Sequence, residues 1–290
     1  MERYNIIVNP IAGGGKTLVA IKVVTDYLDL KKREYKVFYT KRRFHAKEIA
    51  NELSLSGEKY FIIVGGDGTI AEVFNGIANR DEAVIGIIPA GTGNDFSRPL
   101  GIPLDYQEAI KFILENHSKP TDLMQVNDML VHCFATCGID IEIVKICNSM
   151  KKKTPNCYNK ALLKALLYYK GVKFDLTANG KTASYNALLV GATNNGEIAT
   201  GMKLCPFASV EDGIVDVVII KYVNFFKKIP LLLSLKKGTL LGNKNVEHIK
   251  CASASIVIKN CPTLDLDGEL YQNIPFELSV MPQILNIIRK

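Results

Sequence analysis

Several features that mark particular classes of protein are missing from this sequence. Met1–Tyr4 leads directly into a strand pattern, so we expect no secretory signal. Lysine or glycine interrupts the longest apolar stretches well before the ~18 residues that a membrane-spanning helix needs. Internal repeats and low-complexity segments are not evident either. We therefore expect a cytoplasmic protein that is soluble or peripheral at the inner membrane surface.

Cysteine and histidine show no spacing typical of a disulfide framework or a metal site. The seven cysteines are odd in number and scattered, and none of them forms a C-x-x-C pair. The four histidines show no ligand spacing relative to them. We therefore expect reduced thiols in a cytosolic compartment, with neither disulfides nor a zinc site.

The composition is that of an ordinary folded protein with a mild basic bias. The chain has 290 residues, 48% hydrophobic and 22% charged, which is enough for one large domain or two ordinary ones. Its formal net charge of +7 is compatible with anionic nucleotides, an acidic membrane surface or nucleic acid. Because no aromatic RNA-binding motif or helix-turn-helix pattern is present, we expect no nucleic-acid partner.

The first part of the chain alternates between strand and helix patterns. Thr69 and Glu72 stand in the T-x-x-E relation of a capping box, which predicts a helix start just after a glycine turn. The alternation predicts a Rossmann-like α/β domain, a parallel sheet covered by helices with ligands at the carboxyl ends of its strands. The predicted strands are Asn5–Val8, Tyr35–Thr40, Tyr60–Val64 and Val84–Ala90, and the predicted helices lie from Thr17, over Ala46–Leu53, Ile70–Ile77 and Tyr106–Leu114.

Beyond about residue 122 the pattern changes to strands. Val172–Thr177 alternates apolar and polar residues, and Asn179-Gly180 is a strong signal for a two-residue hairpin. We therefore predict an α/β domain over residues 1–122 and a mainly antiparallel β domain over 123–280. We expect a cleft between them and expect residues 281–290 to pack back on the first domain. The further predicted elements are strands at Ala187–Val190, Ile214–Ile220, Ser255–Ile258, Thr263–Leu266 and Phe276–Val280, and helices at Tyr158–Tyr169 and near Ile229–Leu235.

Two glycine turns, each directly after a predicted strand, are the most informative motifs. They are Gly65-Gly66-Asp67-Gly68-Thr69 and Gly91-Thr92-Gly93-Asn94-Asp95-Phe96. A strand that ends in a glycine turn and feeds a helix presents unpaired N–H groups, which together with the helix dipole favour a phosphate. A carboxylate such as that of Asp67 repels a triphosphate unless a cation lies between them, so the motif predicts a polyphosphate ligand with magnesium. The alternative is a turn aspartate that only bonds its own loop.

Four other side chains could bind phosphate in the same region. In the second turn, Thr92 and Asn94 offer donors and Arg98 offers a fork suited to phosphate. Residues Asn9–Thr17 end like a Walker A loop but are not one, because Pro10 stands where that loop has its first glycine. They still form a glycine turn between strand and helix, and Lys16 could reach a phosphate. A plain helix start is the alternative.

Three segments of the second half are ambiguous by pattern alone. Ser209–Asp216 reads as a hairpin turn and Asp265–Glu269 as a solvent-facing strand end. Asn224–Lys237 joins apolar and basic residues in the manner of a membrane-surface helix. An ordinary packed helix with lysine flanks explains the last pattern equally well.

A set of motifs spans nearly the whole chain in a fixed order. Its members are Asn9-Pro10, Gly13, Lys16, Thr40, the two glycine turns, Asp212-Gly213 and Asp267-Gly268-Glu269. The set resembles the soluble bacterial diacylglycerol kinase family, whose wider relatives are the sphingosine and ceramide kinases. The resemblance implies a first domain like those of NAD kinases and phosphofructokinases. It also implies a kinase that uses ATP and Mg²⁺ to phosphorylate a lipid.

The resemblance also assigns roles to single residues. Asp212, with the backbone carbonyls of Ser209 and Ile214, matches a magnesium site, and Glu269 matches the proton acceptor, with Asp67 as the second catalytic residue. The extra glycine in Gly13–Gly15 blurs the alignment of Lys16. Residues that match ATP-binding positions are Asn9, Pro10, Ile11, Ala12, Gly13, Thr40, Gly65, Gly66, Asp67, Gly68, Thr69, Ile70, Ala71 and Thr92, and those that match the phosphate and acceptor region are Lys16, Asn94, Asp95, Arg98 and Asp122.

These assignments predict transfer of the γ-phosphate of ATP to a lipid hydroxyl. They do not carry over the identity of the acceptor, for which diacylglycerol, giving phosphatidic acid, is our expectation. The expected partner is a lipid substrate at a membrane surface, and a homodimer stays open. A NAD kinase is the alternative enzyme, but the segments Asn94–Phe96 and Asp267–Glu269 stand against it. A non-catalytic nucleotide- or lipid-binding regulator is the other alternative, and the presence of Asp67 and Glu269 disfavours it.

Overall fold

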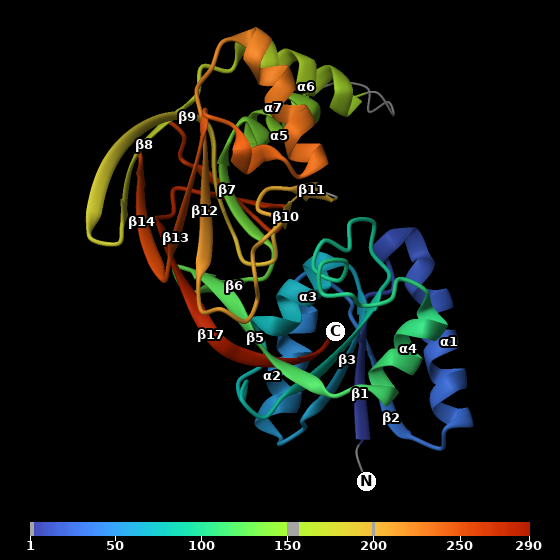
Figure 1. Cartoon of the computed structure of the whole chain (residues 1–290). Coiled ribbons are helices and arrows are strands. Elements are labelled where there is room, and N and C mark those ends of the chain that lie inside the picture. Colours follow the sequence, from blue (N-terminus) through green and yellow to red (C-terminus); the bar gives the residue numbers. More distant parts are fainter. Residues whose placement is uncertain (1–2, 150–156, 199–200) are drawn as a thin grey trace. The chain divides into compact units, whose positions relative to one another are not determined.

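The computed structural model describes residues 3–149, 157–198 and 201–290, which divide into two units (Figure 1). The first unit comprises Met1–Leu123, Val210–Gly213 and Met281–Lys290, and the second comprises Met124–Ser209 and Ile214–Val280. The short segment Val210–Gly213 belongs to the first unit, although the sequence analysis placed it in the second domain. No helix in the described part of the chain is long and apolar enough to cross a membrane.

The first unit is built on a parallel sheet in the order β4-β3-β1-β2. The apolar strands are buried, and Ile6 in the middle of β1 lies opposite Val37 of β2 and Ile62 of β3. The last part of a later strand, β17 (Phe276–Ile288), runs parallel to β4. The strands of the sheet itself are β1 (Arg3–Val8), β2 (Glu34–Tyr39), β3 (Tyr60–Gly65) and β4 (Val84–Pro89).

Helices cover both faces of this sheet (Figure 1). On one face, α1 and α4 pack through Val24 and Ile110, which are fully buried, and on the other face α2 lies beside α3. The Asp105 side chain caps α4 by accepting the N–H groups of Gln107 and Glu108. The helices are α1 (Lys16–Leu30), which follows the short 3₁₀ turn η1 (Ala12–Gly15), α2 (His45–Leu55), α3 (Asp67–Phe74) and α4 (Tyr106–Glu115).

The predicted capping box at Thr69 is wrong. Helix α3 begins two residues earlier, at Asp67, and its cap residue Gly66 makes no side-chain cap. The Glu72 carboxylate instead accepts the N–H groups of Phe44 and Ala46 at the start of α2, at 2.9 and 3.1 Å. A carboxylate there satisfies backbone donors that the helix leaves unpaired. Glu72 therefore joins two helices of the same unit.

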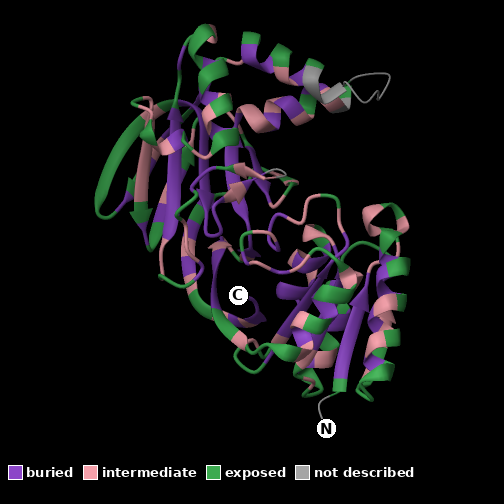
Figure 2. Cartoon of the chain, turned by 45° about the vertical axis from the view of Figure 1, so that its right-hand side comes forward, coloured by how far each residue is buried: buried purple, intermediate pink, exposed green. Residues whose placement is uncertain are grey.

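The second unit is mainly antiparallel β structure. The long strand β9 pairs with β7, β8 and β12, and the predicted Asn179-Gly180 hairpin joins β8 to β9 with both residues at positive φ. Figure 2 shows that β7, β12 and the second half of β9 are largely buried, whereas the β8–β9 hairpin is exposed. The strands are β6 (Met129–Val131), which pairs with the end of β5 (Ser118–Val126), β7 (Phe134–Gly138), β8 (Val172–Ala178), β9 (Lys181–Thr193), β10 (Glu197–Ile198), β11 (Met202–Lys203), β12 (Val215–Lys221), β13 (Val246–Cys251), β14 (Ser253–Ile258), β15 (Thr263–Leu266), β16 (Glu269–Gln272) and the first part of β17.

Helices α5 (Ile139–Ser149), α6 (Cys157–Tyr168) and α7 (Phe225–Lys237) belong to this unit, with a 3₁₀ turn η2 (Leu240–Gly242) after α7. The sequence analysis missed α5 because its β-branched residues lower helix propensity. The helix is held by packing, since Ile143 and Ile146 lie in one buried cluster with Ala161 and Ala165 of α6. The predicted fold class, a Rossmann-like α/β domain followed by a mainly antiparallel β domain, is confirmed.

Candidate active site

Three glycine turns lie together at one edge of the parallel sheet in the first unit. They follow β1, β3 and β4, and the carboxyl ends of parallel strands share an edge. Backbone hydrogen bonds join the chain segments where the turns begin. They run from Asn9 N–H to the Val64 carbonyl at 3.2 Å and from Ala90 N–H to the Gly65 carbonyl at 2.8 Å. The Asn9 side chain adds a bond to the Thr69 hydroxyl at 3.2 Å. The structure thus brings together the three turns that the sequence singled out.

Glycine is required where these turns touch. A Cβ atom on Gly66 would lie 2.9 Å from the Cα atom of Gly91, and one on Gly91 would lie 2.5 Å from the Cα atom of Gly66. A Cβ atom on Gly13, at φ +58°, would lie only 2.1 Å from the Ala90 carbonyl oxygen. The turns are therefore in backbone contact, and their N–H groups lie beside the N-termini of α1 and α3. Such an arrangement favours an anion.

The contact at Gly13 gives a stability prediction. Gly13→Ala and Gly14→Ala both place alanine at positive φ, which costs ~1 kcal/mol. Gly14 has nothing within 4 Å of its added Cβ, so only Gly13→Ala also meets Ala90. We expect urea unfolding to show an additional loss of ~1–3 kcal/mol for Gly13→Ala. Equal losses for the two variants would contradict the packing of the first turn on the third.

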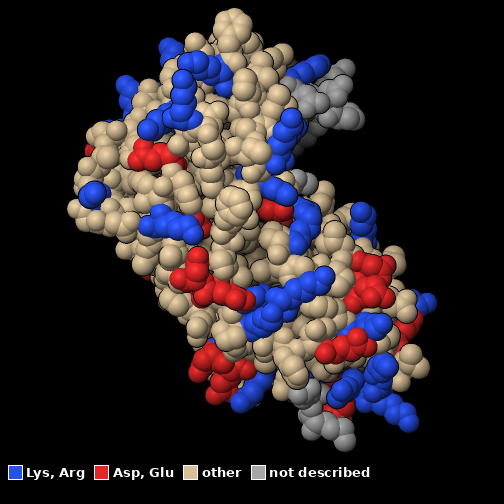
Figure 3. All heavy atoms as spheres, viewed as in Figure 1, with Lys and Arg blue, Asp and Glu red and all other residues tan. Residues whose placement is uncertain are grey.

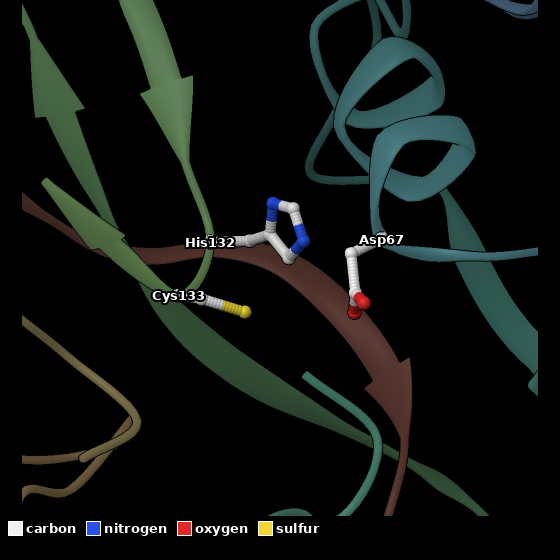
Figure 4. A group of neighbouring side chains, drawn as sticks. All are labelled: Asp67, His132 and Cys133. Atoms are coloured by element: carbon white, nitrogen blue, oxygen red, sulfur yellow. The ribbon is translucent and has the colours of Figure 1, made fainter. Parts of the chain in front are cut away.

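Asp67 joins the second turn to the third. It is the first residue of α3 (Figure 4), where a carboxylate is favourable, and its Oδ1 accepts the N–H group of Phe96 at 3.2 Å. Its other oxygen, Oδ2, lies beside Gly93, because a Cβ atom added there would be 3.0 Å away. The carboxylate is therefore fixed next to the glycine turn predicted to bind phosphate.

Arg98 and Asn94 have a structural role that sequence reasoning missed. The Arg98 guanidinium donates to the Gly93 carbonyl and forms an ion pair with Asp95, so the fork that the sequence analysis considered suited to phosphate also contacts its own turn. Asn94, at φ +55°, accepts the N–H group of Gly91 through Oδ1 at 3.0 Å. Both side chains hold the shape of the third turn, and a phosphate contact from Arg98 would compete with these bonds.

The remaining predicted ATP residues lie in or next to the same turns. Ile11 and Lys16 are exposed, whereas Thr69 and Ile70 are buried, so Ile70 can offer a ligand only its backbone. Thr40 follows β2, and its N–H group bonds to the Val8 carbonyl at 2.8 Å. The others lie either in the glycine turns or near the start of α3. They are Pro10, Ala12, Gly68, Ala71 and Thr92.

The loop that carries Asp212 is anchored by a buried carboxylate. Asp122 accepts the N–H groups of Gly213 at 2.7 Å and Gln283 at 2.8 Å, and its own N–H group bonds to the Val210 carbonyl. Glu211 forms a 2.6 Å ion pair with Arg289. The sequence analysis assigned Asp122 to the phosphate and acceptor region. In the structure it is buried and holds this loop through hydrogen bonds, whereas Asp212 is exposed on the loop.

The two acidic residues of the Asp267-Gly268-Glu269 hairpin have different surroundings. The buried Asp267 carboxylate accepts the N–H groups of His132, Cys133 and Phe134 at 2.9–3.0 Å, and it pairs with His132 Nδ1 at 2.7 Å. Burial opposes its ionisation, but the pKa of Asp267 is lowered because His132 and these donors stabilise the charge. His132 and Cys133 follow one another just before β7 (Figure 4).

Glu269, in contrast, begins β16 and is half-buried. The Tyr271 hydroxyl donates to its Oε2 at 3.4 Å. Asp267 fixes the hairpin that carries Glu269, so one carboxylate of the motif is buried and holds the backbone and the other is half-buried. No sequence spacing could have paired Asp267 with His132, which lies 135 residues earlier.

Comparison with known proteins agrees with this architecture. Residues 3–126 match the diacylglycerol kinase catalytic domain, and residues 134–289 match the YegS C-terminal NAD kinase beta sandwich-like domain. The chain therefore belongs to the diacylglycerol kinase and lipid kinase family.

Similar proteins cover nearly the whole chain. A diacylglycerol kinase of Bacillus subtilis (strain 168) is 27% identical, over 99% of this chain and 96% of its own length. A diacylglycerol kinase of Staphylococcus carnosus (strain TM300) is also 27% identical, over 99% and 94%. A crystal structure of a diacylglycerol kinase from Bacillus anthracis str. Sterne superimposes with a TM-score of 0.80 at 26% identity, covering 100% of this chain and 97% of that one.

Proposed function

We propose that the chain is a lipid kinase that transfers the γ-phosphate of ATP to the hydroxyl of diacylglycerol, giving phosphatidic acid. The observation that carries the proposal is the backbone contact among the three glycine turns, which gathers N–H donors at two helix N-termini. The names of its relatives support the choice of a lipid acceptor. NAD kinase is the alternative, because the second domain match is described as NAD kinase-like.

Phosphoryl transfer needs positioning, neutralisation of the phosphates and a base for the acceptor hydroxyl. The turns after β1, β3 and β4 would position the phosphates, and Lys16, exposed at the first position of α1, would add positive charge. Glu269 would take the proton from the lipid hydroxyl. The hydroxyl oxygen would bond to the γ-phosphorus as the bond from that phosphorus to ADP breaks and ADP leaves. Asp267, by fixing the hairpin, would hold Glu269 ready for that step.

The residues assigned to magnesium fit a hard cation. Asp212 supplies a carboxylate and Ser209 and Ile214 supply backbone carbonyls, which are the oxygen donors that Mg²⁺ prefers. The ion would neutralise phosphate charge, and the bonds of Asp122 to Gly213 and Val210 keep the loop in shape. Asp67 is a further carboxylate oriented toward the third turn.

The second unit contains an apolar cavity of about 550 Å³ that suits an acyl chain. Leucines and isoleucines from α5, α6, α7 and β9 make up half of its lining residues, and its polar members include Asp140 and Asp265. Burial, together with the neighbouring Asp140, raises the pKa of Asp265 to about 7. Asp265 lies on β15, which pairs with β16, the strand that begins at Glu269, so a chain in the cavity would reach the strand next to the proposed base.

A membrane-facing surface on α6 and α7 would give access to a lipid. Phe226, Ile229 and Leu233 recur along the exposed side of α7, and Leu167 and Tyr168 are exposed on α6. On the face shown in Figure 3, basic side chains stand out on the second unit, whereas both signs are mixed on the first. Apolar side chains beside lysines suit an acidic bilayer.

Flotation with liposomes tests this surface. We expect the chain to float with acidic vesicles at low salt, and a Phe226→Ser, Leu233→Ser double variant to lose most of this binding. Val257→Ser, which changes an exposed residue of β14, is the matched control. Absence of the wild-type chain from the lipid fraction at low salt would rule out direct membrane binding.

Incubation with γ-labelled ATP, Mg²⁺ and separate acceptors tests the function. Diacylglycerol, other lipid alcohols and NAD would each be offered, and the label would be followed between organic and aqueous phases. We expect label in the organic phase with diacylglycerol. Label on NAD alone would establish the alternative enzyme, and no transfer to any acceptor would favour a non-catalytic binding protein.

The magnesium assignment has its own test. Asp212→Ala is expected to raise the Mg²⁺ concentration needed for half-maximal activity by about 10-fold or more, because it removes the only charged ligand assigned to the ion. Glu277→Ala removes an exposed carboxylate of β17 that lies outside this loop and serves as the control. An unchanged magnesium titration for Asp212→Ala would reject this site.

A further inference from the structure

A cluster of metal-binding side chains lies in the second unit, among residues to which the proposed kinase reaction gives no role. It consists of the Cys205 thiol, the Asp216 carboxylate and the His248 imidazole, whose ligand atoms all lie within 4.8 Å of one another. His248 Nε2 is 2.6 Å from Asp216 Oδ1 and 3.7 Å from Cys205 Sγ. Three different donor types therefore converge on one small volume.

The fold brings these residues together across long sequence separations. Asp216 on β12 and His248 on the antiparallel strand β13 are diagonal neighbours, because His248 lies opposite Val218. Cys205 is fully buried in the loop after β11, where its N–H group bonds to the Gly196 carbonyl at 3.1 Å. Gly196 itself permits this approach, since a Cβ atom there would lie 2.3 Å from the Cys205 carbonyl oxygen. The loop thus holds the thiol against the strand pair.

The orientation of the imidazole argues for a cation and against a catalytic relay. In a nucleophile–histidine–carboxylate relay, the two ring nitrogens serve different partners. Here the same nitrogen, Nε2, faces both the thiol and the carboxylate. Donor atoms that point at a common centre are the arrangement found around a bound metal ion.

Asp216 supplies a second, independent observation. Its side chain is fully buried, and its Oδ2 atom has no hydrogen-bond donor within the part of the chain that the structure describes. A buried carboxylate oxygen without a partner is costly, and a metal ion would satisfy it. Donor atoms on one tetrahedral zinc ion lie ~3–4 Å apart, which the Cys205–His248 distance matches. Asp216 would then bind through Oδ2.

We propose that Cys205, Asp216 and His248 bind a zinc ion, with water as the fourth ligand. A sulfur, a nitrogen and an oxygen donor suit zinc and not magnesium. The His248 side chain is 25% exposed, so an ion can reach the site from solvent. Binding releases the thiol proton, and the ion ties the loop after β11 to β12 and β13. Sequence spacing predicted no zinc site, because 43 residues separate the cysteine from the histidine.

Cobalt titration of the full chain, stripped of metal by a chelator, tests the proposal. One equivalent of Co²⁺ is expected to give a near-ultraviolet thiolate-to-metal charge-transfer band, which one equivalent of Zn²⁺ abolishes. Cys205→Ala is expected to remove the band. His248→Gln, at a partly exposed position that should tolerate the change, is expected to weaken zinc binding at least ~10-fold.

Cys251→Ala is the matched control. Cys251 is a buried thiol of β13 that packs in the core with Val215, on the opposite face of the strands from Asp216. This variant is expected to keep the band and the zinc affinity. The proposal fails if the wild-type chain gives no charge-transfer band, or if the band survives in Cys205→Ala or His248→Gln binds zinc as tightly as the wild type.

Discussion

Replacing Glu269 by glutamine is expected to lower the turnover of lipid phosphorylation by at least ~100-fold while leaving ATP binding nearly unchanged. Glutamine keeps the size of the side chain and can still accept the bond from the Tyr271 hydroxyl. It cannot take a proton from the acceptor hydroxyl. The loss should therefore appear in kcat and not in the dissociation constant of ATP, which isothermal titration calorimetry would measure in parallel.

Glu277→Gln is the matched control for this variant. Glu277 is an exposed glutamate of β17 whose carboxylate accepts a bond from Ser255, and the amide can still accept it. Turnover is expected to stay at the wild-type level. Full turnover of Glu269→Gln would remove this residue from the mechanism and leave the proton acceptor to be found elsewhere.

The second large effect is expected on stability. Asp267→Ala removes the buried charge that holds three backbone N–H groups and His132, which should lower the free energy of unfolding by about 3–5 kcal/mol. Asp267→Asn keeps an acceptor oxygen and should lose less. Asp175→Ala removes a partly exposed carboxylate paired with Lys259 and should have little effect. Denaturant unfolding would measure all three.

The contribution of the Asp267 carboxylate to the free energy of unfolding is expected to depend on pH. Its pKa is lowered by folding, so its contribution is present above the unfolded pKa of ~3.9 and is lost as the pH falls through the folded value. The stability difference between the wild type and Asp267→Asn should therefore shrink in acid. A difference that stayed constant down to the acid limit, or a fully stable Asp267→Ala, would contradict the role assigned to this charge.

Much of the first unit could be predicted because its signals are local. Apolar strands, glycine turns and helical periodicity lie within short stretches, so Gly65–Thr69 and Gly91–Phe96 were placed at strand ends correctly. The capping box failed because Glu72 is used by a neighbouring helix, which only tertiary packing decides. Arg98 was assigned to a ligand, yet its partners Gly93 and Asp95 lie in its own turn.

The second unit was harder because its important contacts are remote in sequence. Asp267 meets His132, and Asp216 meets His248 and Cys205, only after strands pair. The motif Asp267-Gly268-Glu269 indicated a functional segment. It did not show that the Asp267 carboxylate is buried and binds the backbone before β7. Helix α5 and the zinc cluster gave no local signal, since β-branched residues and scattered cysteines are typical of many structures.

The central claim is that the three glycine turns of the first unit together bind the phosphates of ATP, and amide hydrogen exchange with and without ATP–Mg²⁺ tests it most directly. We expect slower exchange in residues 9–17, 65–71 and 91–96 at once, with no change in Tyr106–Glu115, which forms α4 in the same unit. Saturating nucleotide that left these three segments unprotected, or protected a different region instead, would contradict the account.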